Sequence, residues 1–158
     1  MAQSVSQPRR RRALRLVFRF INSVVGSILR SPVHQLLSGR LALLTFYGRK
    51  SGRRYTTPVG YGRTDGALLV DTESPWWRNL RGGVRVGVRL QGRHRAGTAE
   101  VITDEARMRE AYRIILAATP GYARALGVSV GSDGLPRRED VARIRHKGHV
   151  VVRIELDP

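Results

Sequence analysis

The spacing of apolar and polar residues changes character near residue 41. Between Arg9 and Arg30, polar residues recur every three or four positions, and apolar residues fill the remaining faces. This spacing predicts an amphipathic helix with a narrow basic stripe and a wide apolar face. Residues 1–8 are polar and predict a disordered tail. We therefore expect residues 1–30 to form a tail and a helix distinct from a domain formed by residues 31–158.

Beyond residue 41 the pattern has a period of two, which is typical of strands. Turn signals such as Asp65–Gly66 and Gln91–Gly92 separate the apolar stretches and indicate hairpins. The predicted strands are 41–47, 53–63, 67–72, 84–90, 93–103 and 150–156. Pro58 cannot donate a hydrogen bond within a ladder, so it indicates that the second strand lies at an edge or carries a bulge.

Helical segments occupy less of this part of the chain than strands do. The predicted helices are a short one over 33–37, a helical turn that begins at Pro75, and the segments 105–118, 122–126 and 138–146. Because hairpins join most of the six predicted strands, the pattern favours an antiparallel barrel or sheet over a doubly wound α/β fold. The expected fold class is α+β, mainly β, with flanking helices.

The composition is strongly basic. Of 158 residues, 29 are lysine or arginine and 12 are aspartate or glutamate, which gives a formal net charge of +17. Nearly all the basic residues are arginines, since Lys50 and Lys147 are the only lysines. A positive field of this size attracts nucleic acid, anionic lipid or anionic small molecules, and charge alone does not separate the three. The chain has no cysteine, which excludes disulfides, thiolate nucleophiles and cysteine-ligated metals.

The hydropathy and charge of the chain bear on its location in the cell and on its binding partners. No run of about 18 apolar residues occurs, so a membrane-spanning helix is not expected. The basic stripe of residues 9–30 suits packing on the barrel or, alternatively, the surface of an anionic membrane. Nucleic-acid binding requires aromatic side chains on a basic sheet face, and no known signature of that kind occurs, so no specific nucleic acid is expected. We expect a cytoplasmic protein, with a peripheral place on the inner face of the cell membrane as the alternative.

The turn between the first two strands holds the densest group of chemically useful side chains. Its members are Arg49, Lys50, Ser51, Arg53 and Arg54, together with two glycines. Cations, a hydroxyl and backbone amides suit a phosphate or a carboxylate, because charge-assisted hydrogen bonds are strong. The spacing is not that of a Walker loop, and an ordinary polar turn is the alternative interpretation. This turn is nevertheless the best candidate anion site in the sequence.

A second candidate is the segment Trp76–Leu80, with the sequence WWRNL. Adjacent residues of a helix point about 100° apart, so the two tryptophans cannot face the same way. We expect one tryptophan to close the open end of the barrel. The other, with Arg78 or Asn79, is expected to face a planar ligand.

Other sites for catalysis or metal binding are not expected. The histidines are scattered without metal-ligand spacing, so no metal site is predicted. Asp71 and Glu73 form an acidic pair at a strand end; pairing with arginine is expected there, and a general base is the alternative. Ser51 has no evident histidine or aspartate partner, so acyl-enzyme chemistry is not predicted. No catalytic residue is assigned.

Three segments, in this order and spacing, resemble the deazaflavin-dependent nitroreductase family. They are LALLTFYGRKSGRRYTTPVGY (41–61), WWRNLRGG (76–83) and GTAEVITDEA (97–106). The resemblance implies the split β-barrel of flavin-reductase-like proteins for residues 31–158. It also implies an oxidoreductase that transfers hydride from reduced coenzyme F-420 to an electron-poor organic acceptor, such as a quinone or a nitroaromatic. The cofactor itself performs the hydride transfer, which explains why no acid–base pair stands out.

The resemblance assigns roles to individual residues. The acidic tail of F-420, a phospholactyl and polyglutamate chain, is implied to bind Arg49, Lys50, Ser51, Arg53 and Arg54. Thr57, Pro58 and Val59 are implied to lie beside the deazaflavin ring, and Trp76, Trp77 and Asn79 to border the cofactor pocket. Tyr112 and Tyr122 are the nearest equivalents of the family's substrate tyrosines. The alternatives are a split barrel that binds FMN or a lipid, and a non-enzymatic anion-binding module on membrane or nucleic acid.

Overall fold

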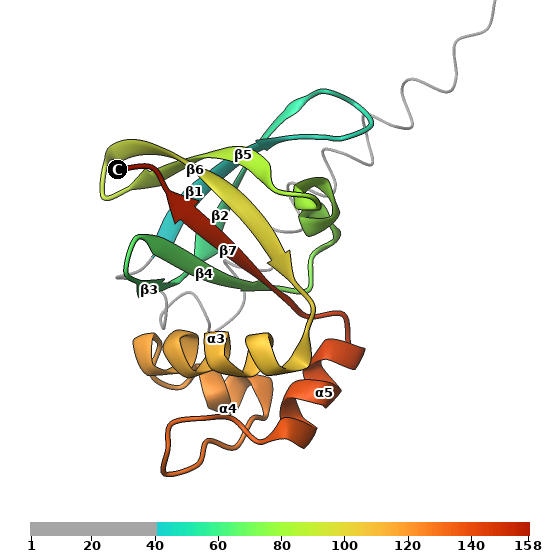
Figure 1. Cartoon of the computed structure of the whole chain (residues 1–158), viewed down its shortest axis with the longest axis vertical. Coiled ribbons are helices and arrows are strands. Elements are labelled where there is room, and N and C mark those ends of the chain that lie inside the picture. The colour runs from blue at the N-terminus through green and yellow to red at the C-terminus, as the bar shows by residue number, and fades with distance from the viewer. Residues whose placement is uncertain (1–40) are drawn as a thin grey trace, which may run out of the picture. The chain divides into compact units, whose positions relative to one another are not determined.

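The computed structural model of the protein describes residues 41–158, and Figure 1 shows how their strands and helices are arranged. The strands are β1 (Leu41–Tyr47), β2 (Arg54–Gly60), β3 (Gly62–Thr64), β4 (Ala67–Thr72), β5 (Val84–Leu90), β6 (Arg93–Ile102) and β7 (Val150–Leu156). The helices are the 3-10 helix η1 (Pro75–Leu80), α3 (Glu105–Ala118), α4 (Tyr122–Leu126) and α5 (Arg138–His146). The predicted tail 1–8, helix 9–30 and helix 33–37 lie outside the described residues.

Neighbouring strands are all antiparallel, and their order in the sheet is β2-β1-β5-β6-β7-β4-β3. The two edge strands, β2 and β3, are consecutive in the chain, and only Tyr61 separates them. Strands at opposite edges can be joined through one residue only if the sheet curls until its edges meet. The seven strands therefore form a curled barrel, which confirms the predicted antiparallel, mainly β fold. Pro58 lies in the edge strand β2, as its missing N–H group predicted.

The predicted count of six strands is wrong, because the structure divides the segment 53–63 into β2 and β3. Up to Gly60 the segment pairs with β1, and from Gly62 it pairs with β4. A Cβ atom on Gly62 would lie 3.0 Å from the Cα atom of Ile115, so glycine allows α3 to approach the chain here. The alternation of apolar and polar residues continues unchanged through such a bend. The sequence pattern therefore could not show that the segment changes its partner strand from β1 to β4.

Alternate residues of the strands fill the inside of the barrel. On β1, Leu44 and Phe46 are buried, whereas Leu43 and Tyr47 point outward and are exposed. The largest buried cluster contains Ala42, Leu44, Phe46, Val59, Tyr61, Leu68, Val70, Trp77, Leu80, Val86, Val88, Ala99, Val150, Val152 and Ile154. Burial of this apolar surface is the main term that stabilises the barrel.

Helices α3 and α5 cover the outward face of β4 and β7 (Figure 1). A second buried cluster forms there, in which Leu69 and Val151 of the sheet pack with Met108, Ile115 and Ile144 of the helices. Helix α3 begins at the N-cap Asp104, whose carboxylate accepts a hydrogen bond from the backbone N–H of residue 107 at 2.9 Å. The helices of this region occupy the predicted ranges, and none of the described helices has the length and apolar character needed to cross a membrane.

Candidate functional site

The tip of the β1–β2 hairpin is a tight, hydrogen-bonded turn. The N–H of Gly48 donates to the carbonyl of Arg53, and the N–H of Gly52 donates to the carbonyl of Gly48, both at 2.8 Å. Gly52 has a φ of 62°, in the left-handed region that favours glycine. The Oγ atom of Ser51 accepts from the N–H of Arg53 at 3.3 Å and lies 3.2 Å from the Oη atom of Tyr55. The predicted serine hydroxyl is therefore part of the turn's own structure.

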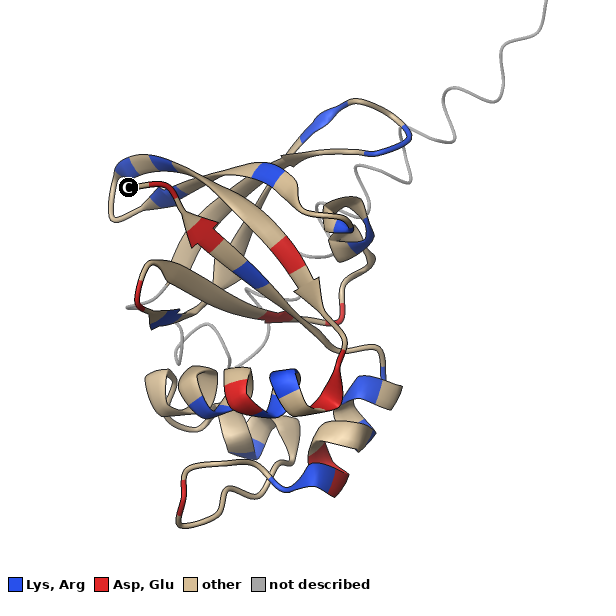
Figure 2. Ribbon diagram, viewed as in Figure 1, with Lys and Arg blue, Asp and Glu red and all other residues tan. Residues whose placement is uncertain are grey.

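The cationic side chains of the tip are exposed to solvent. They are Arg49, Lys50, Arg53 and Arg54, and none of the ion pairs found between residues 41 and 158 includes them. Figure 2 shows Lys and Arg on this hairpin with no Asp or Glu beside them. Four like charges on one turn repel one another, and a bound anion would remove that repulsion. The structure thus brings together all four cations of the predicted anion site.

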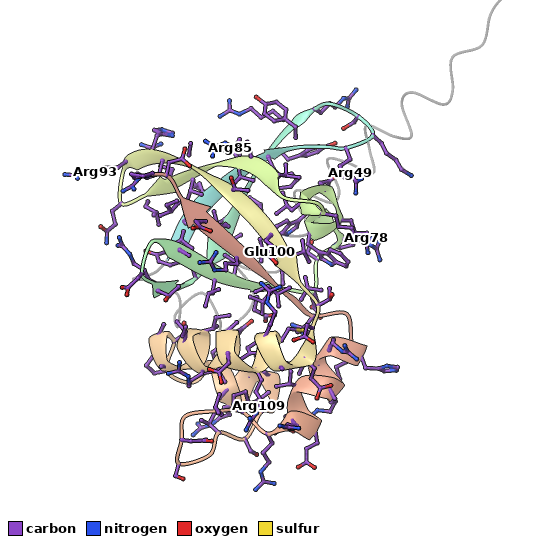
Figure 3. All side chains as sticks on the ribbon, in the orientation of Figure 1. Arg49, Arg78, Arg85, Arg93, Glu100 and Arg109 are labelled. Atoms are coloured by element: carbon purple, nitrogen blue, oxygen red, sulfur yellow. The ribbon has the colours of Figure 1, made fainter. Side chains whose placement is uncertain are left out.

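Asn79 connects the hairpin tip to η1. Its Oδ1 atom accepts a hydrogen bond from the N–H of Arg49 at 3.0 Å, across 30 residues of sequence. Its Nδ2 atom donates to the carbonyl of Trp76, also at 3.0 Å. Both ends of the amide are therefore used, and the side chain fixes the position of the tip relative to the tryptophan segment. Figure 3 shows Arg49 and Arg78, from these two segments, at the same end of the barrel.

Aromatic rings stack beneath the tip. The Phe46 ring lies 5.7 Å from the Tyr55 ring and 5.6 Å from the Trp76 ring, measured between centroids, with both pairs stacked. Trp77 is buried in the barrel core, and the guanidinium carbons of Arg78 and Arg81 lie 5.6 and 4.7 Å from its ring centroid. As predicted, the two tryptophans differ: Trp77 closes the barrel, whereas Trp76 keeps part of its surface in solvent.

The segment Thr57–Val59 lies in the middle of β2. Val59 is buried in the barrel core, so it can offer a ligand only its backbone, whereas Thr57 and Pro58 are half-buried. Among the described strands β2 pairs with β1 alone, so half of its backbone polar groups face away from the ladder. These three residues lie on β2, the strand that begins at Arg54 and leaves the hairpin tip.

Tyr112 and Tyr122 occupy a different place from the tip. Both hydroxyls donate to the carboxylate of Asp71, at 2.7 and 2.5 Å, and the Nδ1 atom of His149 lies 3.1 Å from the same carboxylate. The Nε2 atom of His149 lies 3.4 Å from the carboxylate of Glu73. Figure 1 shows α3 and α4, which carry the tyrosines, at the end of the molecule away from the β1–β2 hairpin. The structure brings the two tyrosines together but does not join them to the hairpin tip.

This group, which we call the Asp71 cluster, consists of Asp71, Glu73, Tyr112, Tyr122 and His149. Burial, followed by the Asp71 charge, raises the pKa of both tyrosines far above the ordinary range, so the phenols remain protonated donors. Burial lowers the pKa of His149, but the Asp71 hydrogen bond and the charges of Asp71 and Glu73 outweigh it, and the net pKa is raised. The cluster joins β4, α3, α4 and the segment before β7.

The arginine partner predicted for Asp71 is wrong. Its partners among the described residues are two phenols and an imidazole, and its side chain is 2% exposed. One signal in the sequence pointed to this cluster: Tyr112 shares the apolar face of α3 with Met108 and Ile115, and a buried tyrosine hydroxyl needs a hydrogen-bond partner. Within residues 41–158, no group of three or more His, Asp or Glu side chains is arranged to hold a metal ion.

Comparisons with known proteins bear on the family and the fold. The family model described as F420H(2)-dependent quinone reductase matches residues 14–131. No curated protein matches the chain. Two solved structures are similar in fold: a conserved hypothetical protein from Mycobacterium tuberculosis, at 18% identity over 81% of each chain with a TM-score of 0.50, and an F420-H2 dependent reductase, FDR-A, at 19% identity over 73% of this chain and 94% of that chain, also with a TM-score of 0.50.

Proposed function

The chain belongs to the F420H(2)-dependent quinone reductase family, and we propose that it uses reduced F-420 to reduce a quinone. The family makes the protein an F420-dependent oxidoreductase with a split-barrel fold. Our proposal adds the acceptor and the residues that bind the cofactor. The observation that supports it most directly is the group of four exposed cations on the hairpin tip, which belong to none of the ion pairs within residues 41–158.

The residues of the tip fit the acidic part of the proposed cofactor. A phosphate and several carboxylates need cationic donors, and Arg49, Lys50, Arg53 and Arg54 project from one turn into solvent. Exposed ion pairs are individually weak, but several cations around one multiply charged ligand act together. Asn79 holds the N–H of Arg49, so this part of the tip is ordered before a ligand binds. An ordered site loses less conformational entropy on binding.

The flat ring of the cofactor would lie beside the aromatic stack in which Phe46 of β1 meets Tyr55 of β2 and Trp76 of η1. Bound F-420 supplies the hydride chemistry, and the protein supplies binding and orientation. Thr57, Pro58 and Val59 would contribute the free edge of β2, with Val59 acting through its backbone. Trp76 would present its exposed surface, and Trp77 would support it from the barrel core.

An acceptor role for Tyr112 and Tyr122 stays a prediction. Both hydroxyls are engaged by Asp71, and Tyr112 is 0% exposed, so only the half-buried ring of Tyr122 can meet an acceptor without rearrangement. Replacement of Tyr122 by Phe removes the hydroxyl and keeps the ring. If Tyr122 contacts the acceptor through its ring, this variant should retain the wild-type KM for the quinone.

Titration of the protein with purified F-420 at moderate salt measures cofactor binding and tests the proposal. We expect saturable binding that weakens with salt, because the ion pairs to the tail are screened. The double variant Lys50→Ala/Arg54→Ala should bind about tenfold more weakly and with a shallower salt dependence. Arg124→Ala/Arg138→Ala, which removes two exposed arginines from α4 and α5, is the charge control. Saturable binding of FMN together with no binding of F-420 would favour the alternative split-barrel flavoprotein.

Oxidation of reduced F-420, followed by absorbance, identifies the acceptor class. We expect turnover with a quinone, as in the family description, and the nitroaromatic is the competing acceptor to be compared at equal concentration. A protein that binds F-420 but reduces the nitroaromatic alone would keep the cofactor assignment and overturn the proposed acceptor.

A further inference from the structure

One side of the barrel carries large apolar side chains in solvent. Leu41, Leu43 and Tyr47 are 43%, 41% and 59% exposed, and all three point outward from β1. The other large apolar side chain with comparable exposure among the described residues is Val130, at 44%, in the loop between α4 and α5. Apolar surface is costly to leave in water, and its concentration on one strand suggests a partner for this side.

The outward residues around β1 form a groove of about 530 Å³. Small residues make its floor, because Thr45 of β1 lies opposite Gly87 of β5, and Gly87 lies opposite Ala96 of β6. Leu43 and Tyr47 line it from β1. We call this surface the basic wall, since its other long side chains are Arg54, Arg85, Arg89 and His94.

Basic side chains lie beside apolar ones on the basic wall. Leu43 is paired with Arg89, Arg89 with His94, and Tyr47 with Arg54 in the strand registers. Arg85 is paired with Asp157 by two hydrogen bonds of 2.8 and 2.5 Å. The groove lining contains no Asp or Glu. Figure 3 shows Arg85 on this part of the sheet.

We propose that the basic wall is a docking surface for an anionic lipid bilayer. Leucine and tyrosine side chains enter the boundary between headgroups and acyl chains, where an apolar body with a polar end is favoured. Arginines beside them reach lipid phosphates, and each basic residue near an anionic surface adds to the attraction. Leu41, Leu43 and Tyr47 supply the first component, and Arg54 and Arg89 the second. Arg54 also belongs to the hairpin tip proposed to bind F-420, so the test below changes Leu43 and Arg89, which lie outside the proposed cofactor site.

The charge pattern favours a bilayer over the other occupants of such a surface. A second copy of the chain, docked through the same patch about a two-fold axis, would bring Arg54, Arg89 and His94 toward their own counterparts. Like charges buried in an interface are costly. Nucleic acid would leave Leu41 and Leu43 without a role, because bases stack on aromatic rings and phosphates bind cations.

Vesicle co-sedimentation of the full chain tests the proposal. The vesicles contain phosphatidylcholine alone, or phosphatidylcholine with an equal part of phosphatidylglycerol. We expect binding to the anionic vesicles, and the wall variant Leu43→Ser/Arg89→Gln should bind them about tenfold more weakly. The control variant Val130→Ser/Arg138→Gln removes the same charge and an apolar side chain of similar exposure from the α4–α5 region, and it should bind as the wild type does. Residues 1–40 are present in the wild type and in both variants, so differences between these proteins report on the substituted residues.

Several results would overturn the proposal. Equal binding by the wild type and the wall variant, or equal loss in the wall and control variants, would show that the wall does not meet the bilayer. Sedimentation velocity without lipid tests the second-copy alternative, because a dimer that the wall variant loses would make the wall an interface between copies. Loss of oligonucleotide binding in the wall variant, with vesicle binding unchanged, would assign the wall to nucleic acid. If the double variant unfolds, vesicle binding is compared between the single variants Arg89→Gln and Arg138→Gln.

Discussion

Two sides of the barrel's outer surface have the same strand geometry but differ in what covers them. Beneath α3 and α5, the outward residues of β4 and β7 are apolar and buried, as Leu69 and Val151 show. On the basic wall, three arginines and a histidine lie beside small residues, and Leu43 is exposed among them. Period-two patterning alone therefore does not reveal which outward leucine is structural. Whether an outward leucine contributes to stability depends on whether another element packs against it. This contrast yields predictions that can be ranked by the size of the effect.

The largest effect is expected at Asp71, the polar centre of the covered side. Replacement by Ala leaves two buried phenols and His149 without their shared acceptor. Loss of a buried, charged acceptor is expected to lower the free energy of unfolding by about 3–5 kcal/mol. Urea denaturation measures the change, with Asp65→Ala in the exposed β3–β4 turn as the control. A change below about 1 kcal/mol would show that the cluster does not hold the covered side together.

Paired leucine substitutions test the contrast between the two sides most directly. Leu69 is 4% exposed beneath α3, and Leu43 is 41% exposed on the basic wall, yet both point outward from their strands. Leu69→Ala is expected to cost about 2–4 kcal/mol through lost burial and a cavity. Leu43→Ala should change the free energy of unfolding by less than about 0.5 kcal/mol.

Urea denaturation of both leucine variants measures the difference. Equal losses for the two would mean that something also covers the wall in the free protein, and the proposed lipid surface would then not be exposed. A destabilising Leu69→Ala with a neutral Leu43→Ala supports the division of the barrel into a covered side and a basic wall.

Local features of the fold could be predicted from the sequence, and long-range ones could not. Strand positions follow from alternation along the chain, and the cationic turn between β1 and β2 follows from residues that are adjacent in sequence. The exchange of partners at Tyr61 has no local signature. The contacts of Asp71 reach Tyr122 across 51 residues and His149 across 78. The packing of four segments decides which polar residues meet in the interior. That packing cannot be inferred from local patterns in a single sequence.

A smaller effect is expected at Asn79, which joins the tip to η1. Asn79→Ala removes the acceptor for the N–H of Arg49 and the donor to Trp76. We expect a loss of about 1 kcal/mol in the free energy of unfolding, the usual net value of a hydrogen bond, and weaker F-420 binding because the tip is less ordered. Ser74→Ala, in the same segment but without a side-chain capping bond, is the control. Unchanged F-420 binding in Asn79→Ala would show that the tip needs no support from η1.

The smallest effect is a pH dependence that arises from His149. The charged groups around the imidazole are Asp71 of β4, Glu73 after it and the neighbouring Lys147, while Tyr112 and Tyr122 remain protonated. Because the pKa of His149 is raised in the folded protein, the folded state binds a proton more tightly than the unfolded chain does, whose histidine titrates near about 6.5.

The contribution of His149 should therefore be complete below about pH 6.5 and disappear as the pH rises through the folded-state pKa. Denaturation at several pH values should show wild-type stability falling over this window relative to His149→Gln. Glu73→Gln should shrink the effect without abolishing it, since Asp71 contributes more to the shift than Glu73 does. Stability that rises with pH in this window relative to His149→Gln would mean that burial outweighs the carboxylates and that the imidazole is held neutral.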